Sequence, residues 1–186
     1  MCIWNPSLCG FCSFSSAAGI LSIGRIKGFD EEIRIRNVYG PYKDREPFWQ
    51  RIINNIQFQD TNTILGGNLN FTVSSSEVWG SNHWDPLADF FIDFMRNEGL
   101  VDICPVPLCL TWRNNRVAGQ GVAKRLDRFL LFEQLTTNLD KYRVWQINSL
   151  ISNHAPICLQ IGPEESNRNY PFKFNHDWLR LPDFHS

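Results

Sequence analysis

The sequence lacks the excess of positive charge that is typical of proteins that bind nucleic acid over a broad surface. Lysine and arginine number 18 against 19 aspartate and glutamate residues, so the net charge is −1 and the isoelectric point lies near 6.4. This balance excludes a general electrostatic attraction to nucleic acid or to an anionic membrane. Any contact with phosphate has to come from a local cluster of cations.

Long apolar runs are also missing. No stretch approaches the ~20 apolar residues that cross a bilayer, so we expect a soluble chain that does not enter membranes. Residues 1–24 carry no charge, but Pro6, Gly10 and several serines interrupt them. A secretory signal begins with positive charge and continues as an unbroken apolar run, so this segment is not read as one.

The six cysteines do not form the disulfide framework that small secreted domains use. We expect reduced thiols, because a chain of 186 residues with 43% hydrophobic residues can bury a core in one domain without such bonds. Cys9 and Cys12 have the spacing of half a zinc site or of a redox pair. No second cysteine or histidine pair has matching spacing, which argues against zinc.

Hydrophobic periodicity predicts a mixed order of strands and helices. Residues 32–39 alternate apolar and charged side chains as a strand with one buried face does, and residues 19–26 form another strand. Helices are predicted after Asp44 and after the pair Asp85 and Pro86. Further strand candidates are residues 63–65, 100–104, 110–112, 125–132, 142–148 and 156–161. We therefore predict an α/β (α+β) fold with two packed sheets and flanking helices.

Four side chains suited to phosphodiester chemistry fall at predicted strand ends or in the loops that follow. They are Tyr39, Asn70, Asp127 and His154. Cleavage requires a positioned water, a proton acceptor, a cation and donors to the phosphate oxygens, and loops on a rigid scaffold can bring such groups into one cleft. Each residue also has a purely structural alternative, as a strand-end aromatic, a turn residue, a partner for arginine or a core histidine.

A local basic cluster lies between residues 113 and 128. It could hold phosphate, and the alternative is a solvated charged loop. The cluster sets five cations against Asp127, namely Arg113, Arg116, Lys124, Arg125 and Arg128.

Four segments occur in the order seen in the endonuclease/exonuclease/phosphatase family. They are Asn37-Val38-Tyr39-Gly40-Pro41, Gly66-Gly67-Asn68-Leu69-Asn70, Lys124-Arg125-Leu126-Asp127-Arg128-Phe129-Leu130 and Ser152-Asn153-His154-Ala155-Pro156-Ile157. The chain resembles in particular the endonuclease domain of plant non-LTR (LINE-type) retrotransposons, over residues 19–161. Residues 1–18 form a divergent apolar segment. Residues 162–186 are similar to the linker that precedes the reverse transcriptase, which is absent from this chain.

The resemblance implies a four-layer sandwich of two mixed sheets flanked by helices, with catalytic loops at one edge. It implies Mg²⁺ as cofactor, DNA or RNA as partner, a monomer, and action in the nucleus. His154 would meet the scissile phosphate and Asp127 would orient it, while Tyr39 and Asn70 would hydrogen-bond in the same site. Thr111 and Trp112 are similar to the strand before a substrate-facing hairpin, although Trp112 can equally be a core residue.

Three departures from the family pattern reduce the expected activity. Asn68 and Asn153 stand where the family has Asp, the first to position and deprotonate water and the second to help with the metal. The family's metal-binding Glu precedes the segment similar to residues 16–20, and residues 1–15 contain neither Asp nor Glu. Asparagine is neutral, binds Mg²⁺ less well than a carboxylate and has no usable basicity at neutral pH.

These departures predict a Mg²⁺-dependent nuclease ancestor whose descendant is weak or inactive and whose metal is poorly retained. They also predict a fold truncated at its N-terminus and poorly ordered there, because Pro6 and Gly10 disfavour a regular strand. Two alternatives stay open. One is a binding module that holds DNA or RNA without cutting it, and the other is a remnant without function.

Overall fold

The computed structural model describes residues 2–54, 62–81, 83–116, 120–139, 141–147, 149 and 151–162. Its largest element is a six-stranded mixed sheet in the order β1-β2-β3-β4-β9-β6. Only β3 and β4 run parallel, and every other neighbouring pair is antiparallel. The strands are β1 (Cys9–Ser16), β2 (Gly19–Ile26), β3 (Ile33–Val38), β4 (Thr63–Asn68), β6 (Leu100–Asp102) and β9 (Asp127–Phe132).

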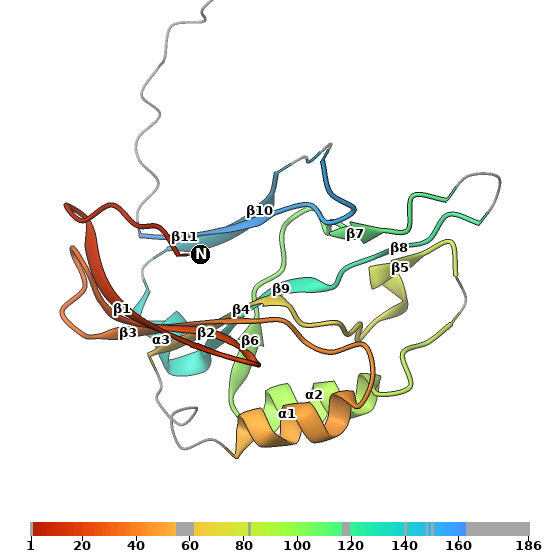
Figure 1. The fold of residues 1–186 in the computed structure, drawn as a ribbon, viewed down its shortest axis with the longest axis horizontal. Coiled ribbons are helices and arrows are strands. Elements are labelled where there is room, and N and C mark those ends of the chain that lie inside the picture. The colour runs from red at the N-terminus through yellow and green to blue at the C-terminus, as the bar shows by residue number, and fades with distance from the viewer. Residues whose placement is uncertain are drawn as a thin grey trace, which may run out of the picture.

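Two smaller antiparallel sheets accompany it. One consists of β10 (Tyr142–Gln146) and β11 (Ile157–Ile161), and the other joins β5 (Val78–Trp79), β8 (Ala123–Lys124) and β7 (Trp112–Arg113). Helices α1 (Arg45–Ile53) and α2 (Ala88–Asn97) lie side by side on one face of the large sheet, and β10 and β11 lie on the other (Figure 1). Short helices η2 (Ser75–Glu77) and α3 (Glu133–Asn138) complete the fold. This arrangement confirms the predicted mixed α/β sandwich.

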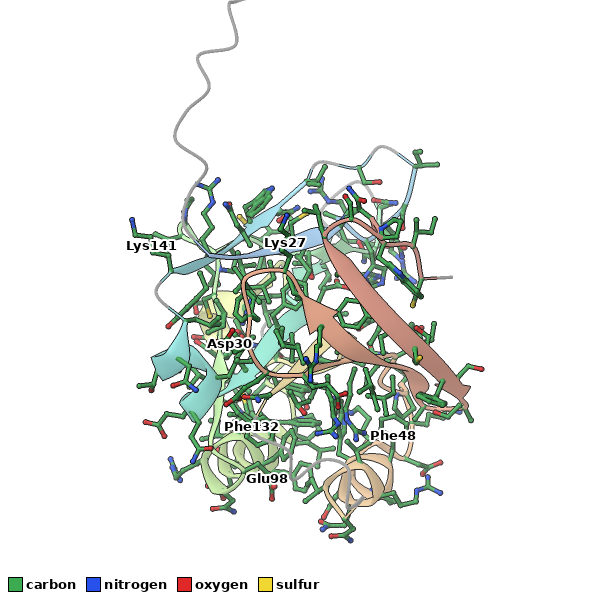
Figure 2. All side chains as sticks on the ribbon, turned by 90° about the vertical axis from the view of Figure 1, so that its left-hand side faces the viewer. Lys27, Asp30, Phe48, Glu98, Phe132 and Lys141 are labelled. Carbon is green, nitrogen blue, oxygen red and sulfur yellow. The ribbon has the colours of Figure 1, made fainter. Side chains whose placement is uncertain are left out.

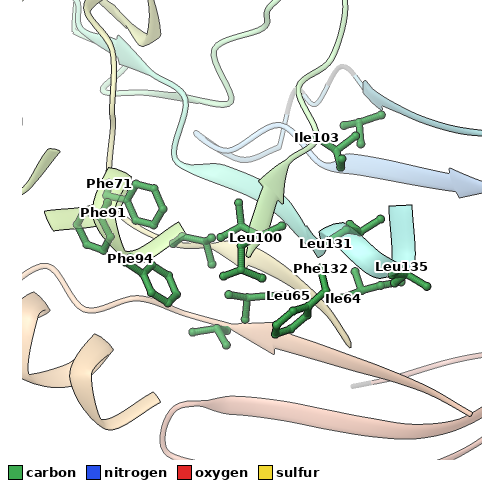
Figure 3. Packing of buried hydrophobic residues seen from close by; sticks show 14 of the residues in the cluster. Ile64, Leu65, Phe71, Phe91, Phe94, Leu100, Ile103, Leu131, Phe132 and Leu135 are labelled. Atoms are coloured by element: carbon green, nitrogen blue, oxygen red, sulfur yellow. The ribbon is translucent and has the colours of Figure 1, made fainter. Parts of the chain in front are cut away.

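The core between the helices and the sheet is centred on Trp49, which is fully buried. Its ring centroid lies 6.0 Å from that of Phe71, 5.9 Å from Phe91 and 5.7 Å from Phe94. Side chains fill this layer (Figure 2), and the aromatic group continues into the aliphatic residues of β4, β6 and β9 (Figure 3). Burial of each such side chain contributes about 1.5–3 kcal/mol. Because Phe71 directly follows Asn70, this core also anchors a segment that carries candidate site residues.

Both predicted helices form, and only the second begins later than predicted. The apolar face predicted for the second helix packs on the core, but α2 begins at Ala88, two residues after Pro86. Asp85 still accepts a hydrogen bond from the Leu87 N–H, at 3.0 Å. Asp44 occupies the N-cap position of α1 with a φ of 51°, and its side chain makes no capping hydrogen bond. No described helix is long and apolar enough to cross a membrane.

Residues 9–16 form a regular strand, so the expectation that Pro6 and Gly10 would prevent one is wrong. All eight residues of β1 pair with β2, from Cys9 opposite Ile26 to Ser16 opposite Gly19. Pro6 lies in the turn before the strand, where its missing N–H costs no ladder hydrogen bond, and glycine is tolerated at an edge strand. Pairing with β2 therefore stabilises β1 by more than the local composition of β1 destabilises it.

The expectation of one buried face on β3 is also corrected. Ile33 is buried, as predicted, but Arg36 and Val38 on the opposite face are buried too, because other elements cover both faces of this central strand. Burial lowers the pKa of Arg36, and the nearby charge of Arg34 lowers it further. The predicted linker after Gly162 lies outside the described residues.

Candidate functional site

A cleft of about 730 Å³ opens at the edge of the sandwich where β4 ends. Segments that follow β3 and β4, the end of β8 and the loop before β11 all contribute to its walls. The catalytic and metal positions predicted from the sequence converge here, and those that line the cleft are Tyr39, Asn68, Asn70, Asn153 and His154. Asp127, the remaining position, contacts the cleft through His154.

Asp127 and His154 form the central pair of the site. The Oδ2 atom of Asp127 lies 2.9 Å from Nδ1 of His154, and both side chains are partly buried. A carboxylate accepts, so this contact favours the tautomer with the proton on Nδ1 and leaves Nε2 as the ring's other polar atom. The Thr111 hydroxyl donates to the same Oδ2 atom at 2.6 Å. The carboxylate is thereby held from two sides.

The loop that carries His154 is fixed to β7 and to Thr111, which directly precedes it. The Ala155 N–H donates to the Thr111 carbonyl at 2.7 Å, and the Arg113 N–H donates to the Asn153 carbonyl at 3.0 Å. Between these bonds, Trp112 and His154 form an antiparallel bridge. Backbone pairing therefore sets the position of the imidazole before any ligand is present.

The glycine pair before Asn68 allows β4 to pass close to β3. Gly67 has a φ of 122°, and a Cβ atom there would lie 2.3 Å from the Val38 carbonyl oxygen. Asn68 is in register with Asp127, and its Oδ1 atom accepts from the Asn70 N–H at 3.0 Å. Asn70 has a φ of 58°, and its side-chain amide donates to the Gly40 carbonyl. These bonds bring the segment that carries Tyr39 and the Gly-Gly-Asn segment into one wall of the cleft.

An arginine and an aspartate that the motifs did not single out support this wall. Arg45 forms two hydrogen bonds of 2.7 Å to the Asp85 carboxylate and a third, of 3.0 Å, to the Asn70 carbonyl. Burial opposes ionisation of Asp85, but the bonds from Arg45 and from the backbone N–H groups of Leu87 and Thr72 outweigh it and hold the pKa of Asp85 below its ordinary value. Local sequence indicated only a helix cap at Asp85, because Arg45 lies 40 residues away.

The donor groups do not fit a Mg²⁺ site built from carboxylates. Within the described ranges, no group of three or more His, Cys, Asp or Glu side chains is placed to hold a metal ion. Asp85 is engaged by Arg45, Asp127 is engaged by Thr111 and His154, and Asn68 and Asn153 supply only neutral amides. We therefore derive no step through a metal.

Three of the five predicted phosphate-binding cations are accessible. Lys124 lines the main cleft. Arg113 lines a polar pocket of about 210 Å³ that shares Asn153 and His154 with the main cleft. Arg116 is exposed in the segment between β7 and β8. Positive charge thus lies in both pockets that His154 lines.

The assignment of Arg125 and Arg128 to this surface is wrong, because they are 1% and 0% exposed. Arg125 donates to both carboxylate oxygens of Asp102, at 2.6 and 2.7 Å, and to Glu77 at 2.9 Å. Arg128 bonds the same two carboxylates and lies over the Phe71 ring, 4.8 Å from its centroid. Burial alone would raise the pKa of Asp102, but the bonds and charges of the two arginines outweigh it and lower that pKa.

No protein-family model and no curated protein matches the sequence. Among solved structures, the endonuclease domain of TRAS1, a telomere-specific non-LTR retrotransposon, is similar with a TM-score of 0.65 and 18% identity. The match covers 88% of this chain and 73% of that one. AP endonuclease LMAP from Leishmania major is similar with a TM-score of 0.60 and 13% identity, over 78% of this chain and 55% of that one.

These likenesses show the fold. The chain has an endonuclease/exonuclease/phosphatase-type fold, which confirms the fold that the four sequence motifs implied.

Proposed function

We propose that this chain is an endonuclease-like domain derived from a non-LTR retrotransposon. It binds the phosphodiester backbone of DNA in the cleft above Asp127 and His154, and it hydrolyses that backbone weakly or not at all. The observation that carries the proposal is the 2.9 Å contact between Asp127 and His154 at a cleft that Tyr39 and Asn70 also line. The likeness of the fold to the TRAS1 endonuclease domain supports it.

The cleft supplies groups suited to holding a phosphodiester. A protonated His154 can donate from Nε2 to a phosphate oxygen, and the Asp127 carboxylate stabilises the positive charge that this requires. The Tyr39 hydroxyl and the side-chain amide of Asn70 are further donors at the same cleft. Lys124 adds a positive charge to the wall. These groups bind and orient a phosphate without requiring a base.

Water activation is the step that we propose to be impaired. Asn68 has no basic group, and its Oδ1 atom already accepts from the Asn70 N–H. In serine proteases the exchange of a catalytic Asp for Asn lowers kcat about 10⁴-fold, which illustrates how poorly the amide replaces a carboxylate. At Asn153 a neutral amide also gives up roughly 4 kcal/mol of attraction to each unit of positive charge about 4 Å away.

The test is nicking of supercoiled plasmid with and without Mg²⁺. We expect slow or undetectable nicking by the wild-type chain and a faster, Mg²⁺-dependent rate for the double variant Asn68→Asp and Asn153→Asp. Adding His154→Ala to that double variant should abolish the gain. Nicking by the wild-type chain at the rate of the double variant would show that the two asparagines do not limit the reaction.

A second candidate is a module that binds DNA or RNA without cutting it. Arg113 and Lys124 line two pockets that both include His154, and this favours the function because cations near the site hold a backbone whether or not it is cleaved. Salt-sensitive binding together with an inert Asn68→Asp and Asn153→Asp variant would identify it.

A further inference from the structure

We propose that the cleft takes an unpaired stretch of nucleic acid, with a nucleobase stacked on Trp84 and Tyr42 at the cleft mouth and a neighbouring phosphate held by Arg113. This inference rests on the proposed function and deepens it, because it names single-stranded nucleic acid as the preferred ligand. It depends on the two cavities that meet at His154.

Three aromatic side chains that line the main cleft are exposed to solvent, and one of them, Tyr39, is already a predicted catalytic position. Tyr42 is 86% exposed and Trp84 is 54% exposed, and both line the cleft. Among the described aromatic residues, neither ring packs against another ring. Large flat rings left in water at the mouth of a polar cleft offer apolar area that a flat ligand can cover.

The Arg45–Asp85 pair holds both rings on the same wall. Tyr42 lies three residues before Arg45 and Trp84 immediately precedes Asp85, so the two hydrogen bonds of 2.7 Å join the segments that carry the rings. A further bond from Arg45 to the Asn70 carbonyl connects this wall to the predicted catalytic segment. The rings are therefore placed by buried contacts, although they are themselves exposed.

The second cavity adjoins the main cleft at His154 and has a different chemistry. Arg113, Ser149 and Ser152 line it, and it shares Asn153 and His154 with the main cleft. Arg113 forms no ion pair with any residue in the described part of the chain. Its backbone N–H donates to the Asn153 carbonyl, and its side chain lines the same pocket as the histidine. Guanidinium and hydroxyl donors are suited to a phosphate.

The pairing of an aromatic platform with a phosphate pocket favours an unpaired strand. In a duplex each base is already stacked and paired, so no base face is free to stack on the exposed rings. In a single strand the base is free, and one stacked base contributes about tenfold in affinity. A strand crossing His154 would set its base in the main cleft and its next phosphate in the adjoining pocket.

The experiment compares fluorescently labelled oligothymidylate with a duplex of equal length, bound to the whole chain in metal-free buffer. We expect the single strand to bind about tenfold more tightly. Trp84→Leu and Tyr42→Leu should each remove most of that preference, because they should weaken single-strand binding more than duplex binding. Trp79→Leu is the matched control, because Trp79 is also exposed, at 64%, and lies outside the cleft.

The outcomes separate this inference from the function on which it rests. Equal affinity for the two ligands, or equal weakening of both by Trp84→Leu, overturns the preference for unpaired strands and leaves nucleic-acid binding standing. Binding of neither ligand overturns both proposals. A preference that Trp79→Leu removes as well would place the stacking surface elsewhere and also overturn the inference.

Discussion

Thr111 joins more parts of the candidate site than its place in the sequence indicates. Its buried hydroxyl donates to Asp127 and accepts from the N–H groups of Leu126 and Asp127, at 3.0 Å each. Its carbonyl accepts from Ala155, next to His154. One small side chain thus connects the carboxylate, the start of β9 and the histidine loop.

Thr111→Val should destabilise the fold although it preserves shape. The valine leaves two backbone donors without their acceptor and removes one of the two hydrogen bonds to Asp127 Oδ2. Unsatisfied buried groups cost about 1–3 kcal/mol. Urea denaturation measures the change in the free energy of unfolding. Thr111→Ser keeps the hydroxyl and is expected to cost less than the valine. Equal losses for the two variants would mean that packing, not hydrogen bonding, is what Thr111 contributes.

Gly67→Ala should destabilise the chain by more than about 2 kcal/mol, because the backbone conformation is strained for alanine and the new Cβ atom meets the Val38 carbonyl at 2.3 Å. Gly10→Ala is the control, since nothing lies within 4 Å of a Cβ atom there and its φ is ordinary. Thermal unfolding compares the two. A Gly67→Ala protein as stable as Gly10→Ala would show that β3 and β4 can move apart at no cost.

The sequence located the candidate site residues that belong to short local motifs. Tyr39, Asn70 and His154 could be found because strand ends and turn residues are visible in a short window, and all three line one cleft. The Arg45–Asp85 pair could not, because its two members are 40 residues apart and each has an ordinary local explanation. Partners at that separation are fixed by the packing of whole elements.

At the scale of elements, the buried ion network fastens three segments behind the cleft. Glu77 of η2 and Asp102 at the end of β6 bind two arginines, Arg125 just before β9 and Arg128 within it. Two positive and two negative groups balance one another, which removes the main cost of burying them. Loss of either carboxylate would leave buried positive charge without its partner.

Asp102→Asn should lower the free energy of unfolding at neutral pH by about 3–5 kcal/mol, the cost of breaking a buried pair from one side. The lowered pKa of Asp102 means that its ionised form stabilises the fold above the ordinary aspartate value of about 4, and that this stabilisation is lost as the pH falls through the lowered pKa. Wild-type stability should therefore fall in acid more steeply than that of the variant.

The control for this prediction is Asp93→Asn. Asp93 pairs with Arg96 on the exposed face of α2, where an ion pair contributes little. Denaturant titrations across the acid range measure both variants. Similar losses for the exposed and the buried aspartate would contradict the role assigned to the network.

Elements were predictable where their own residues decide their structure. The strand at residues 19–26 matches β2, and the apolar stripe after Asp85 matches α2. The strand β1 was missed because its stability comes from pairing with β2, while its own residues argue against it. The burial of Arg125 was missed for a related reason. A basic run in the sequence suggests an exposed surface, and the carboxylates that pair with it are distant in the sequence.

At the scale of the whole molecule, charge limits how nucleic acid can be held. The net charge of −1 gives no general attraction, and the burial of Arg125 and Arg128 reduces the predicted basic cluster to Arg113, Arg116 and Lys124. Few phosphates can then be contacted, so counterion release contributes modestly to affinity. Contacts to groups other than phosphate, such as those made by the aromatic rings of the cleft, have to supply the remaining affinity.

Lys124→Ala should therefore change salt dependence as well as affinity. With three cations in contact, the slope of log affinity against log salt concentration should be about −2 to −3, and the variant should reduce its magnitude by about 1. Lys27→Ala is the matched control, because Lys27 (labelled in Figure 2) follows β2 at the Ile33 end of the sheet and lines another pocket. The cleft is lined by Tyr39, which follows Val38 at the other end of β3. Binding titrations over a range of salt concentrations measure both slopes. Equal slopes for the two variants would show that Lys124 does not contact phosphate, and that the nucleic acid lies elsewhere on the surface.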